Sequence, residues 1–356
     1  MRVLTVVGAR PQFIKAAPVT NALREAGYEE ILVHTGQHYD HQMSQVFFDE
    51  LAIARPDVEL AVGSDNPGRQ LARILMELEP VVARTRPDWV IVYGDTNSTL
   101  AGALAANKAR VPLVHVEAGL RSFNREMPEE HNRVLTDHMA DMLFCPTATA
   151  VSNLEREGIE RGVHLVGDPM LDAIQHFLPL ARARSSPLDR LGVSKKKYAL
   201  ATVHRPYTVD IPERFASIMT ALSALDFPVI FPIHPRTRVR TGETLNEGAW
   251  GANIRVIEPL GYLEMLMLEE NAALILTDSG GVQREACFLG VPCLTLRPET
   301  EWVETVESGW NIVVDTDSDR IGHVARHHVW PTNRAVSSFD GGVAPRIVET
   351  LGKYRK

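Results

Sequence analysis

Three carboxylates lie at or just after the ends of apolar runs in the first half of the chain. Asp95 follows the run 89–93, Glu117 follows the run 112–116, and Glu129 precedes an amphipathic stretch soon afterwards. Short apolar runs bounded by polar residues predict buried strands. The carboxyl ends of parallel strands are where ligands bind in an open sheet, and carboxylates gathered there are suited to proton transfer. We therefore predict an acid–base site built from these three residues.

Each carboxylate also has a structural interpretation. An Asp after a strand can cap the next helix, although Thr96 and the polar residues that follow it could do so in place of Asp95. Glu117 would be buried at its strand end, where a carboxylate needs a partner or becomes harder to ionise. Glu129 or Glu130 could simply favour the N-terminus of the helix that they precede.

Two strand-to-helix turns carry residues suited to a phosphate group. The turn at 8–15 has a glycine, a proline and two cations beside a helix N-terminus, whose free N–H groups favour anions. The turn at 277–285 has a serine and two glycines before a helix, and a glutamate that could accept ribose hydroxyls. A solvated turn and a simple helix N-cap are the respective structural interpretations. The candidate binding residues are Arg10, Lys15, Ser279, Gly280, Gly281 and Glu285.

The alternation of strands and helices predicts an α/β fold with doubly wound parallel sheets. In the first half we expect strands at 3–7, 31–35, 89–93, 112–116, 142–145 and 163–166, and helices at 11–26, 44–51, 68–86, 98–110, 130–140 and 148–157. After a charged break at 182–197, we expect strands at 198–203, 229–233, 254–257, 274–277 and 293–296, and helices at 212–225, 262–271 and 282–289. His204 and Arg205 would then lie at a strand end in the second half. A lone histidine there could be structural or could face a ligand.

These elements predict two Rossmann-like domains that face a central cleft. The first comprises residues 1–168, with a last helix at about 344–356 packing back on it, and the second comprises residues 169–343. A chain of 356 residues with 45% hydrophobic and 23% charged residues has ample core for two domains.

Composition and charge exclude several classes of function. The formal net charge of −8 gives no basic footprint for nucleic acid. No apolar run approaches a membrane span, and the N-terminus lacks the apolar region of a signal peptide. The three cysteines show no metal-binding spacing and are expected to be buried, reduced thiols of a cytoplasmic protein. The 13 histidines are scattered, so we predict no metal.

Taken together, the motifs resemble the non-hydrolysing UDP-N-acetylglucosamine 2-epimerase family over nearly the whole chain. That family has the two-Rossmann-domain architecture of GT-B glycosyltransferases. The matching segments are GARPQFIK (8–15), TGQHYD (35–40), YGDTNST (93–99), HVEAGLRS (115–122), MPEEHNRVLTDH (127–138), HR (204–205), DSGGVQREA (278–286) and RPETEWVE (297–304). Their joint presence in this order is far more specific than any one of them.

The resemblance implies a role for each candidate residue. UDP would be held by Arg10, Lys15, His204, Ser279, Gly280, Gly281 and Glu285. Protons would be handled by Asp95, Glu117 and Glu129, with His204 supporting catalysis near the leaving diphosphate. The reaction would convert UDP-GlcNAc to UDP-ManNAc by eliminating UDP to a glycal and adding it back. No cofactor is required, and the resemblance implies a homodimer and a product used for surface polysaccharide.

Departures from the common family pattern leave the sugar open. Pro206, Tyr207 and Thr208 follow His204-Arg205 in place of the usual residues, and Trp302-Val303 stands where many members have Arg-Pro. The segment around residues 120–130 is closer to the branch that acts on UDP-2,3-diacetamido-2,3-dideoxyglucuronate. If that sugar is the substrate, Arg121 and Arg125 are candidates for contacting its C6 carboxylate.

A hydrolysing 2-epimerase, a GT-B glycosyltransferase and a nucleotide-sugar sensor would share parts of the same site. The first would release free sugar and UDP, the second would need an acceptor, and the third would not need the three carboxylates. Some relatives bind a second substrate molecule for regulation. The residues that would match that second site are Gln42, Arg69, Glu130 and His234.

Overall fold

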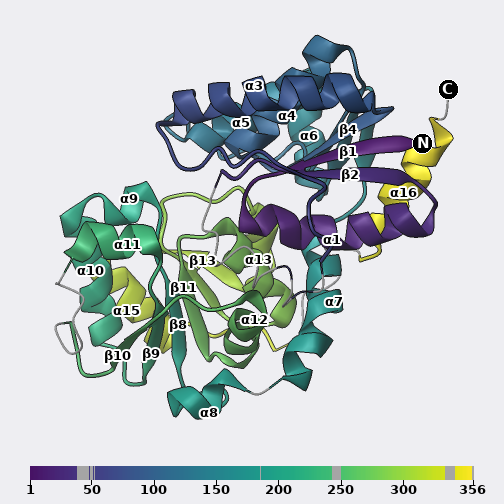
Figure 1. Ribbon diagram of the computed structural model, residues 1–356. Helices are drawn as coiled ribbons and strands as arrows, with labels where there is room; N and C mark the ends of the chain where they lie inside the picture. The colour runs from purple at the N-terminus through teal and green to yellow at the C-terminus, as the bar shows by residue number, and fades with distance from the viewer. Residues whose placement is uncertain are drawn as a thin grey trace. The chain divides into compact units, whose positions relative to one another are not determined.

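The computed structural model describes residues 1–37, 48, 51, 53–184, 186–242, 250–332 and 341–354. The chain divides into two compact units, one formed by Met1–His176 with Phe339–Lys356 and the other by Phe177–Ser338 (Figure 1). Sequence analysis placed the boundary after residue 168. The units instead divide within α7 (Pro169–Ala183), a helix that it did not predict. Prolines at the start and inside α7 hide its helical periodicity, because proline is more often a helix breaker.

The first unit contains a seven-stranded parallel sheet in the order β3-β2-β1-β4-β5-β6-β7. The strands are β1 (Arg2–Val7), β2 (Glu29–His34), β3 (Val58–Glu59), β4 (Trp89–Tyr93), β5 (Leu113–Val116), β6 (Met142–Cys145) and β7 (Val163–Leu165). The chain direction across the sheet reverses between β1 and β4. That reversal is the topological switch point, beside which open α/β sheets bind their ligands.

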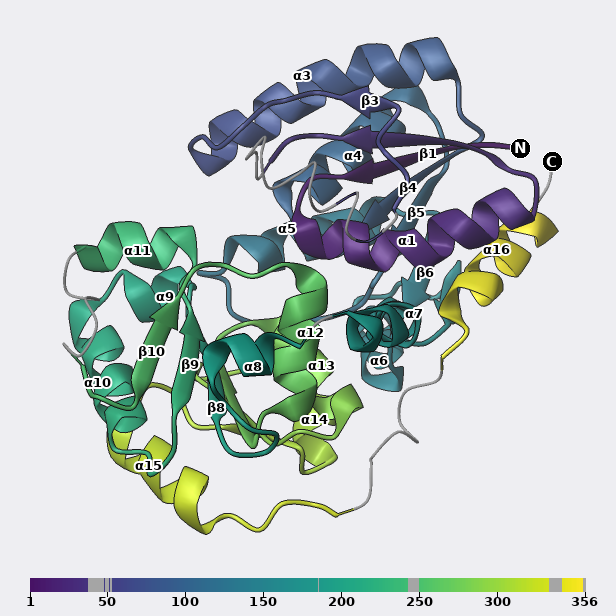
Figure 2. The ribbon, with the colours of Figure 1, turned by 60° about the horizontal axis from the view of Figure 1, so that its bottom comes forward.

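Helices cover both faces of this sheet. They are α1 (Arg10–Glu25), α3 (Pro67–Thr85), α4 (Asn97–Ala109), α5 (Pro128–Met139), α6 (Ala148–Arg156) and α16 (Val343–Lys353). Figure 1 shows α3, α4 and α5 on one face, and Figure 2 shows α1 beside α16 on the other. The backbone N–H groups of Gly342 and Ala344 donate to Asp172 at 2.7 and 2.9 Å, which fixes the start of α16 on α7.

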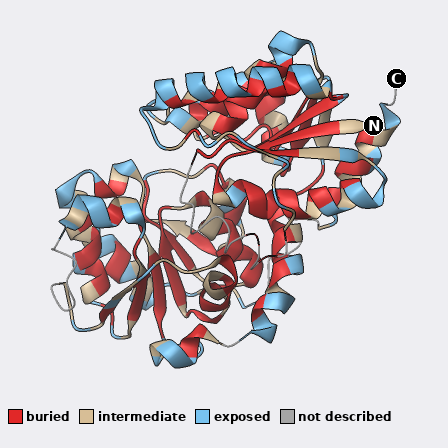
Figure 3. Cartoon of the chain, in the orientation of Figure 1, coloured by how far each residue is buried: buried red, intermediate tan, exposed pale blue. Residues whose placement is uncertain are grey.

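The core of the first unit lies between the sheet and its helices (Figure 3). Val6, Val92 and Ala101 are completely buried there, together with Ile74 and Leu78 of α3. Strands buried on both faces have continuous apolar sequences, which is why the sequence revealed them clearly.

The second unit contains a six-stranded parallel sheet in the order β10-β9-β8-β11-β12-β13. The strands are β8 (Ala199–Thr202), β9 (Val229–Pro232), β10 (Ile254–Ile257), β11 (Leu274–Thr277), β12 (Cys293–Thr295) and β13 (Asn311–Val313). The helices are α8 (Pro187–Leu191), α9 (Pro206–Val209), α10 (Pro212–Ser223), α11 (Pro235–Thr241), α12 (Tyr262–Asn271), α13 (Gly280–Leu289), α14 (Val303–Glu307) and α15 (Ser318–His327). The switch point of this sheet lies between β8 and β11.

The predicted α/β class with doubly wound parallel sheets is confirmed in both units. The expected helix at 44–51 lies mainly outside the described residues. Sequence analysis missed short elements such as β3, β13, α9, α11 and α14, and also α15, whose sequence is largely polar.

Two further properties of the described residues bear on the class of protein. No helix in this part of the chain is both long and apolar enough to cross a membrane. All three cysteines are unpaired and buried, as predicted. Burial raises the pKa of the Cys145 and Cys293 thiols well above the ordinary value, so both are poor nucleophiles.

Candidate active site

The predicted site residues follow the strands that border the two switch points. In the first unit, Arg10 and Lys15 follow β1, Asp95 follows β4 and Glu117 follows β5. β4 pairs in parallel with both β1 and β5, so the carboxyl ends of these three strands meet at one edge of the sheet. In the second unit, His204 follows β8, and the turn that begins with Ser279 follows β11, again on adjacent parallel strands.

Glu117 is buried and bonded to a cation. Its carboxylate pairs with the ammonium group of Lys15, which is itself buried on α1. The Glu117 backbone adopts a left-handed φ of 69°, which is strained for a residue with a side chain. The N–H groups of Glu117 and Ala118 both donate to the Phe144 carbonyl at 3.1 Å, holding this conformation. The partner that sequence analysis required for a buried carboxylate is therefore Lys15.

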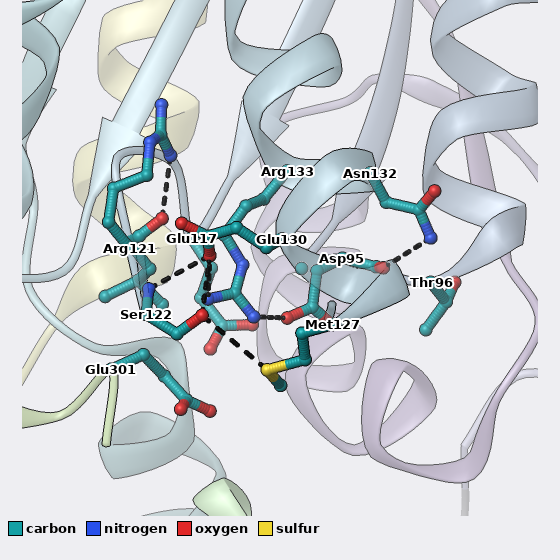
Figure 4. Close-up of polar contacts among 12 residues, drawn as sticks. Asp95, Thr96, Glu117, Arg121, Ser122, Met127, Glu130, Asn132, Arg133 and Glu301 are labelled. Atoms are coloured by element: carbon teal, nitrogen blue, oxygen red, sulfur yellow. Dashed lines mark hydrogen bonds and ion pairs between the residues drawn. The ribbon is translucent and has the colours of Figure 1, made fainter. Parts of the chain in front are cut away.

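Asp95 is half-buried and also bonded to a cation. The guanidinium of Arg133 on α5 donates to the Asp95 carboxylate, and the Asn132 amide donates to the Asp95 carbonyl at 2.9 Å (Figure 4). Thr96, not Asp95, caps α4 through the Thr99 N–H at 3.3 Å. The carboxylate of Asp95 is thus not needed for capping, as the sequence indicated.

Glu129 and Glu130 both lie in the first turn of α5, but their surroundings differ. Glu130 is buried and accepts from the N–H groups of Ser122 and Phe123, each at 2.9 Å. It also accepts from Arg133 at 3.1 Å, so Glu130 is a structural residue. Glu129 is partly exposed. It precedes Arg133 by one helical turn, so the two residues share one face of α5.

The N-terminus of α1 offers fewer backbone donors than expected. The N–H groups of Gly8 and Ala9 donate to the side-chain oxygen of Gln12 at 2.8 and 3.0 Å. Pro11 has no N–H, and the Gln12 N–H donates to the Ala9 carbonyl at 2.9 Å. Sequence analysis expected these groups to be free for a phosphate, and that expectation is wrong for most of them. An anion at this turn would depend on the side chains of Arg10 and Lys15.

In the second unit, a buried aspartate organises the loop that carries His204. Asp278 accepts from the backbone N–H groups of His204 and Arg205 at 2.9 and 2.7 Å, and from the Thr208 hydroxyl. The ring Nδ1 of His204 lies 3.3 Å from the same carboxylate. The ring stacks on His234, with 4.9 Å between the ring centroids. His204 is therefore held in place and partly exposed.

The turn at Ser279 caps α13, as the simpler interpretation required. The Ser279 side chain accepts from the Val282 N–H at 3.5 Å, a long and weak bond. A Cβ at Gly280 would collide with Glu301, so this glycine has a reason within the protein. A Cβ at Gly281 would meet only Ser279 Oγ within 4 Å, at 3.7 Å. Glu285 is buried on α13.

Arg121 does not face a ligand. Its guanidinium is buried and donates to Asp137 at 2.7 Å and to Glu157 at 2.7 and 2.8 Å. The hypothesis that Arg121 contacts a sugar carboxylate is therefore wrong, because the guanidinium is already saturated by two carboxylates. Arg125 is exposed on the same loop.

Of the residues matched to a second substrate molecule, Arg69 and Glu130 belong to the first unit and His234 to the second. Gln42 lies outside the described residues, and Glu130 already binds backbone and Arg133. Arg69 is exposed on α3. His234 caps α11, where its ring accepts from the Arg236 N–H at 3.1 Å.

Sequence reasoning missed the residues that hold the site together. These are Gln12, which binds the Gly8 N–H, Arg133, which binds Asp95, Asp137, which binds the Gly119 N–H, and Asp278, which binds the His204 N–H. Arg133 and Asp137 lie on α5 four residues apart, so both could have been assigned to one helix face that meets the strand ends. Their partners could not be chosen from local pattern.

Cation-paired carboxylates beside the switch point of a doubly wound sheet are suited to acid–base chemistry. A protein-family model described as UDP-N-acetylglucosamine 2-epimerase matches residues 21–352. The chain belongs to the UDP-N-acetylglucosamine 2-epimerase family, which is a family of isomerases.

Individual relatives extend over nearly the whole chain. A UDP-N-acetylglucosamine 2-epimerase homolog of Methanococcus maripaludis is 52% identical, over 99% of both chains. A UDP-2,3-diacetamido-2,3-dideoxy-D-glucuronate 2-epimerase of Pseudomonas aeruginosa is 47% identical, over 99% of this chain and 100% of that protein. The crystal structure of Methanocaldococcus jannaschii UDP-GlcNAc 2-epimerase in complex with UDP-GlcNAc and UDP is similar with a TM-score of 0.90 and 42% identity, over 99% and 100% of the two chains.

The fold is shared more widely. A calicheamicin glycosyltransferase is 15% identical, with a TM-score of 0.57 over 100% of this chain and 99% of that one. This likeness concerns the fold alone and supports the GT-B-like class.

Proposed function

We propose that the protein inverts C2 of a UDP-linked 2-acetamido sugar and interconverts UDP-GlcNAc and UDP-ManNAc. The observation that carries the proposal is the pair of cation-bound carboxylates at adjacent strand ends, Glu117 with Lys15 and Asp95 with Arg133. Carboxylate side chains are among the groups that can accept a proton from a substrate and return it.

Elimination and re-addition explain why such carboxylates are needed. The C2 hydrogen has no neighbouring carbonyl and is not acidic. Breaking the C2–H and C1–O bonds releases a proton and UDP and leaves a glycal. UDP then bonds again to C1, and a proton is delivered to the opposite face of C2. Such a route needs proton-transfer groups that address both faces, and we assign Asp95, Glu117 and Glu129 to this task.

The remaining predicted residues would hold the nucleotide. Arg10 would offer a cation to the diphosphate, and the Ser279–Gly281 turn would offer backbone and hydroxyl donors. Lys15 would serve the diphosphate only by leaving Glu117, to which its buried ammonium group is bonded. His204, fixed by Asp278, would stabilise the departing diphosphate. Glu285 would accept ribose hydroxyls. The scheme itself consumes no nicotinamide, flavin or metal.

A second candidate sugar is UDP-2,3-diacetamido-2,3-dideoxyglucuronate. The 47% identity to the Pseudomonas enzyme named for that substrate supports it. Since Arg121 is saturated, Arg125 is the remaining candidate of the two for the C6 carboxylate.

We also propose a homodimer, which sedimentation would measure, and a cytoplasmic location, which the three buried free thiols favour.

One experiment separates these possibilities. The protein is incubated with UDP-GlcNAc, and separately with the diacetamido uronate, in deuterated water and followed by NMR. Deuterium at C2 with the UDP-sugar retained supports the proposal and identifies the sugar. Free sugar indicates a hydrolysing epimerase, and transfer only when an acceptor is added indicates a glycosyltransferase. Absence of exchange with both sugars would contradict either epimerase.

Arg125→Met tests the choice of sugar directly. If Arg125 binds the uronate, its kcat/KM should fall about tenfold or more, because a charged hydrogen bond is lost, while turnover of UDP-GlcNAc stays the same. Arg84→Met, which changes another exposed arginine of the first unit, is the control. Equal loss with both sugars would argue that Arg125 does not read the C6 group.

A further inference from the structure

His115 is a fully buried histidine on β5 with hydrogen bonds at both ring nitrogens. Nε2 lies 2.7 Å from the Gly94 carbonyl, and Nδ1 lies 2.6 Å from Asp137 Oδ1. A carbonyl oxygen can only accept, so Nε2 carries a hydrogen. The contact between Nδ1 and the Asp137 carboxyl is a second hydrogen bond of the same ring.

Asp137 is surrounded by donors. Besides His115, it accepts from the Gly119 N–H at 3.1 Å and from Arg121 Nη1 at 2.7 Å. Burial alone would raise the pKa of the Asp137 carboxyl, but the adjacent His115 and Arg121 outweigh burial and lower it below its ordinary value. Asp137 is therefore a carboxylate that joins a ring, a backbone amide and a guanidinium.

The two groups connect the loops that carry two of the proposed proton-transfer residues. Gly94, whose carbonyl binds His115, immediately precedes Asp95. Gly119, whose N–H binds Asp137, lies just after the strained Glu117. A Cβ at Gly119 would collide with the Ala150 carbonyl, and the Gly119 carbonyl accepts from Asn153 at 3.0 Å. The Glu117 loop is thus fixed from α5 and from α6.

We propose that His115 and Asp137 are positioning residues that hold the Asp95 and Glu117 loops in one fixed relation for proton transfer. They act on the substrate by placing those two carboxylates and do not contact it directly. This role rests on the proposed function. A misplacement of about 1 Å in a reacting group can cost roughly a hundredfold in rate. Because His115 and Asp137 bind both loops, they would keep the two carboxylates in a fixed position relative to each other.

The two hydrogen bonds of His115 can be removed separately. His115→Gln places an amide donor near the position of Nε2 and loses the bond to Asp137. His115→Asn places a donor near the position of Nδ1 and loses the bond to Gly94. Asp137→Asn removes the negative charge but keeps an acceptor. Asp141→Ala is the control, because it removes the 2.8 Å bond that anchors Leu113 at the opposite end of β5.

Turnover is measured per UDP-binding site, with the Kd for UDP and the melting temperature determined in parallel. We expect kcat to fall about ten- to a hundredfold in the three test variants, with the Kd for UDP changed less than about twofold. Asp141→Ala should lower the melting temperature and leave kcat unchanged. If the test variants lose melting temperature while kcat per site equals that of the wild type, His115 and Asp137 are merely structural and the proposal is wrong.

A readout independent of turnover separates this proposal from the proposed function. Amide hydrogen exchange of Gly94, Asp95 and Gly119 should accelerate in His115→Asn and Asp137→Asn and stay the same in Asp141→Ala. Unchanged exchange at these three amides in both test variants would overturn the positioning role. Absence of C2 exchange by the wild type, with accelerated amide exchange in the variants, would instead contradict the proposed function.

Discussion

The aspartate and glutamate side chains at the strand ends of the two units are used in different ways. In the first unit, Glu117 and Asp95 each face the charged side chain of another element, Lys15 and Arg133. In the second unit, Asp278 after β11 is completely buried and faces the backbone of a neighbouring loop, where it binds the N–H groups of His204 and Arg205. The same position in two similar sheets therefore carries two kinds of carboxylate.

The difference suggests a division of labour between the units. A carboxylate paired with a side-chain cation can take up a substrate proton without releasing a backbone N–H group. A carboxylate that holds backbone amides cannot do so without disturbing its loop. We infer that the proton-transfer carboxylates belong to the first unit, whereas Asp278 of the second unit supports the loop that carries His204. Variants of the cation-paired carboxylates should then change kcat, and variants of Asp278 should change stability.

The largest effect is expected for Asp95→Asn. The amide keeps the shape of the side chain but cannot take a proton, so kcat should fall by about a hundredfold to ten-thousandfold, with UDP binding largely intact. Initial rates and calorimetric titration with UDP measure the two quantities. Asp65→Asn, an exposed aspartate before α3, is the control. Turnover of Asp95→Asn close to that of the wild type would remove Asp95 from the mechanism.

Asp278→Ala should instead act on folding. The two backbone donors and the Thr208 hydroxyl would lose their acceptor in a buried place. Each unsatisfied buried group costs about 1–3 kcal/mol, so we expect the free energy of unfolding to fall by roughly 3 kcal/mol or more. Denaturant unfolding followed by circular dichroism measures it. Asp278→Asn, which keeps one acceptor oxygen, should lose less. Equal stability of Asp278→Ala and the wild type would contradict the inferred difference between the units.

Much of this fold, and the strand ends at which the candidate site residues lie, could be predicted from sequence because the strands are short, apolar and buried. The predicted bounds of β4, β6, β10, β11 and α12 coincide with those observed. β5 and β11 stop directly before Glu117 and Asp278, and β4 stops two residues before Asp95. Hydrophobic periodicity reports burial directly, so strand ends, and the side chains just beyond them, were accessible to prediction.

The ion-pair partners of these side chains could not be predicted from the sequence, because such pairing depends on packing between distant segments. Nothing local indicates that Lys15 binds Glu117. The same limit explains the error over Arg121, whose two carboxylate partners lie on α5 and just after α6. Gln12 is different, because a glutamine at the third helical position is a local capping signal that sequence analysis did not use. Motifs placed these residues near a site, and only the structure decided which were already engaged.

Ser279→Ala tests the binding role of the second unit. Among the described residues the Ser279 hydroxyl accepts one long bond, from the Val282 N–H, so the loss of stability should be small. If it donates to the diphosphate, the Kd for UDP should rise about tenfold, as expected for a hydrogen bond to a charged group, while kcat changes little. Ser308→Ala, a serine near the end of α14, is the control. A large fall in kcat with an unchanged Kd for UDP would assign Ser279 to the chemical step and contradict the inferred difference between the two units.

The smallest effect is expected for a carboxylate of the first unit that lies away from the switch point. The Glu30 side chain on β2 is 1% exposed, and its Oε1 accepts from the hydroxyls of Thr5 and Thr20 at 2.8 and 3.1 Å. Burial raises its pKa from 4.5, and the two hydroxyls and Arg24 only partly oppose that rise. Because the folded state holds the proton more tightly, stability is complete below pH 4.5 and falls as the pH rises through the raised pKa.

Glu30→Gln keeps the acceptor for both threonines and removes the buried charge. We expect the free energy of unfolding at about pH 7 to increase by about 1 kcal/mol, with no gain below pH 4.5, where the wild-type side chain is already neutral in both states. Urea unfolding at the two pH values measures the difference, and turnover should not change. The neighbouring Glu29 is exposed and pairs with Arg2 at 3.0 Å, so Glu29→Gln should change stability by less than about 1 kcal/mol at either pH. An equal gain in the free energy of unfolding for Glu30→Gln at both pH values would show that the Glu30 charge is not the cause. The buried Glu30 would then not differ from the cation-paired carboxylates at the strand ends in the cost of its charge.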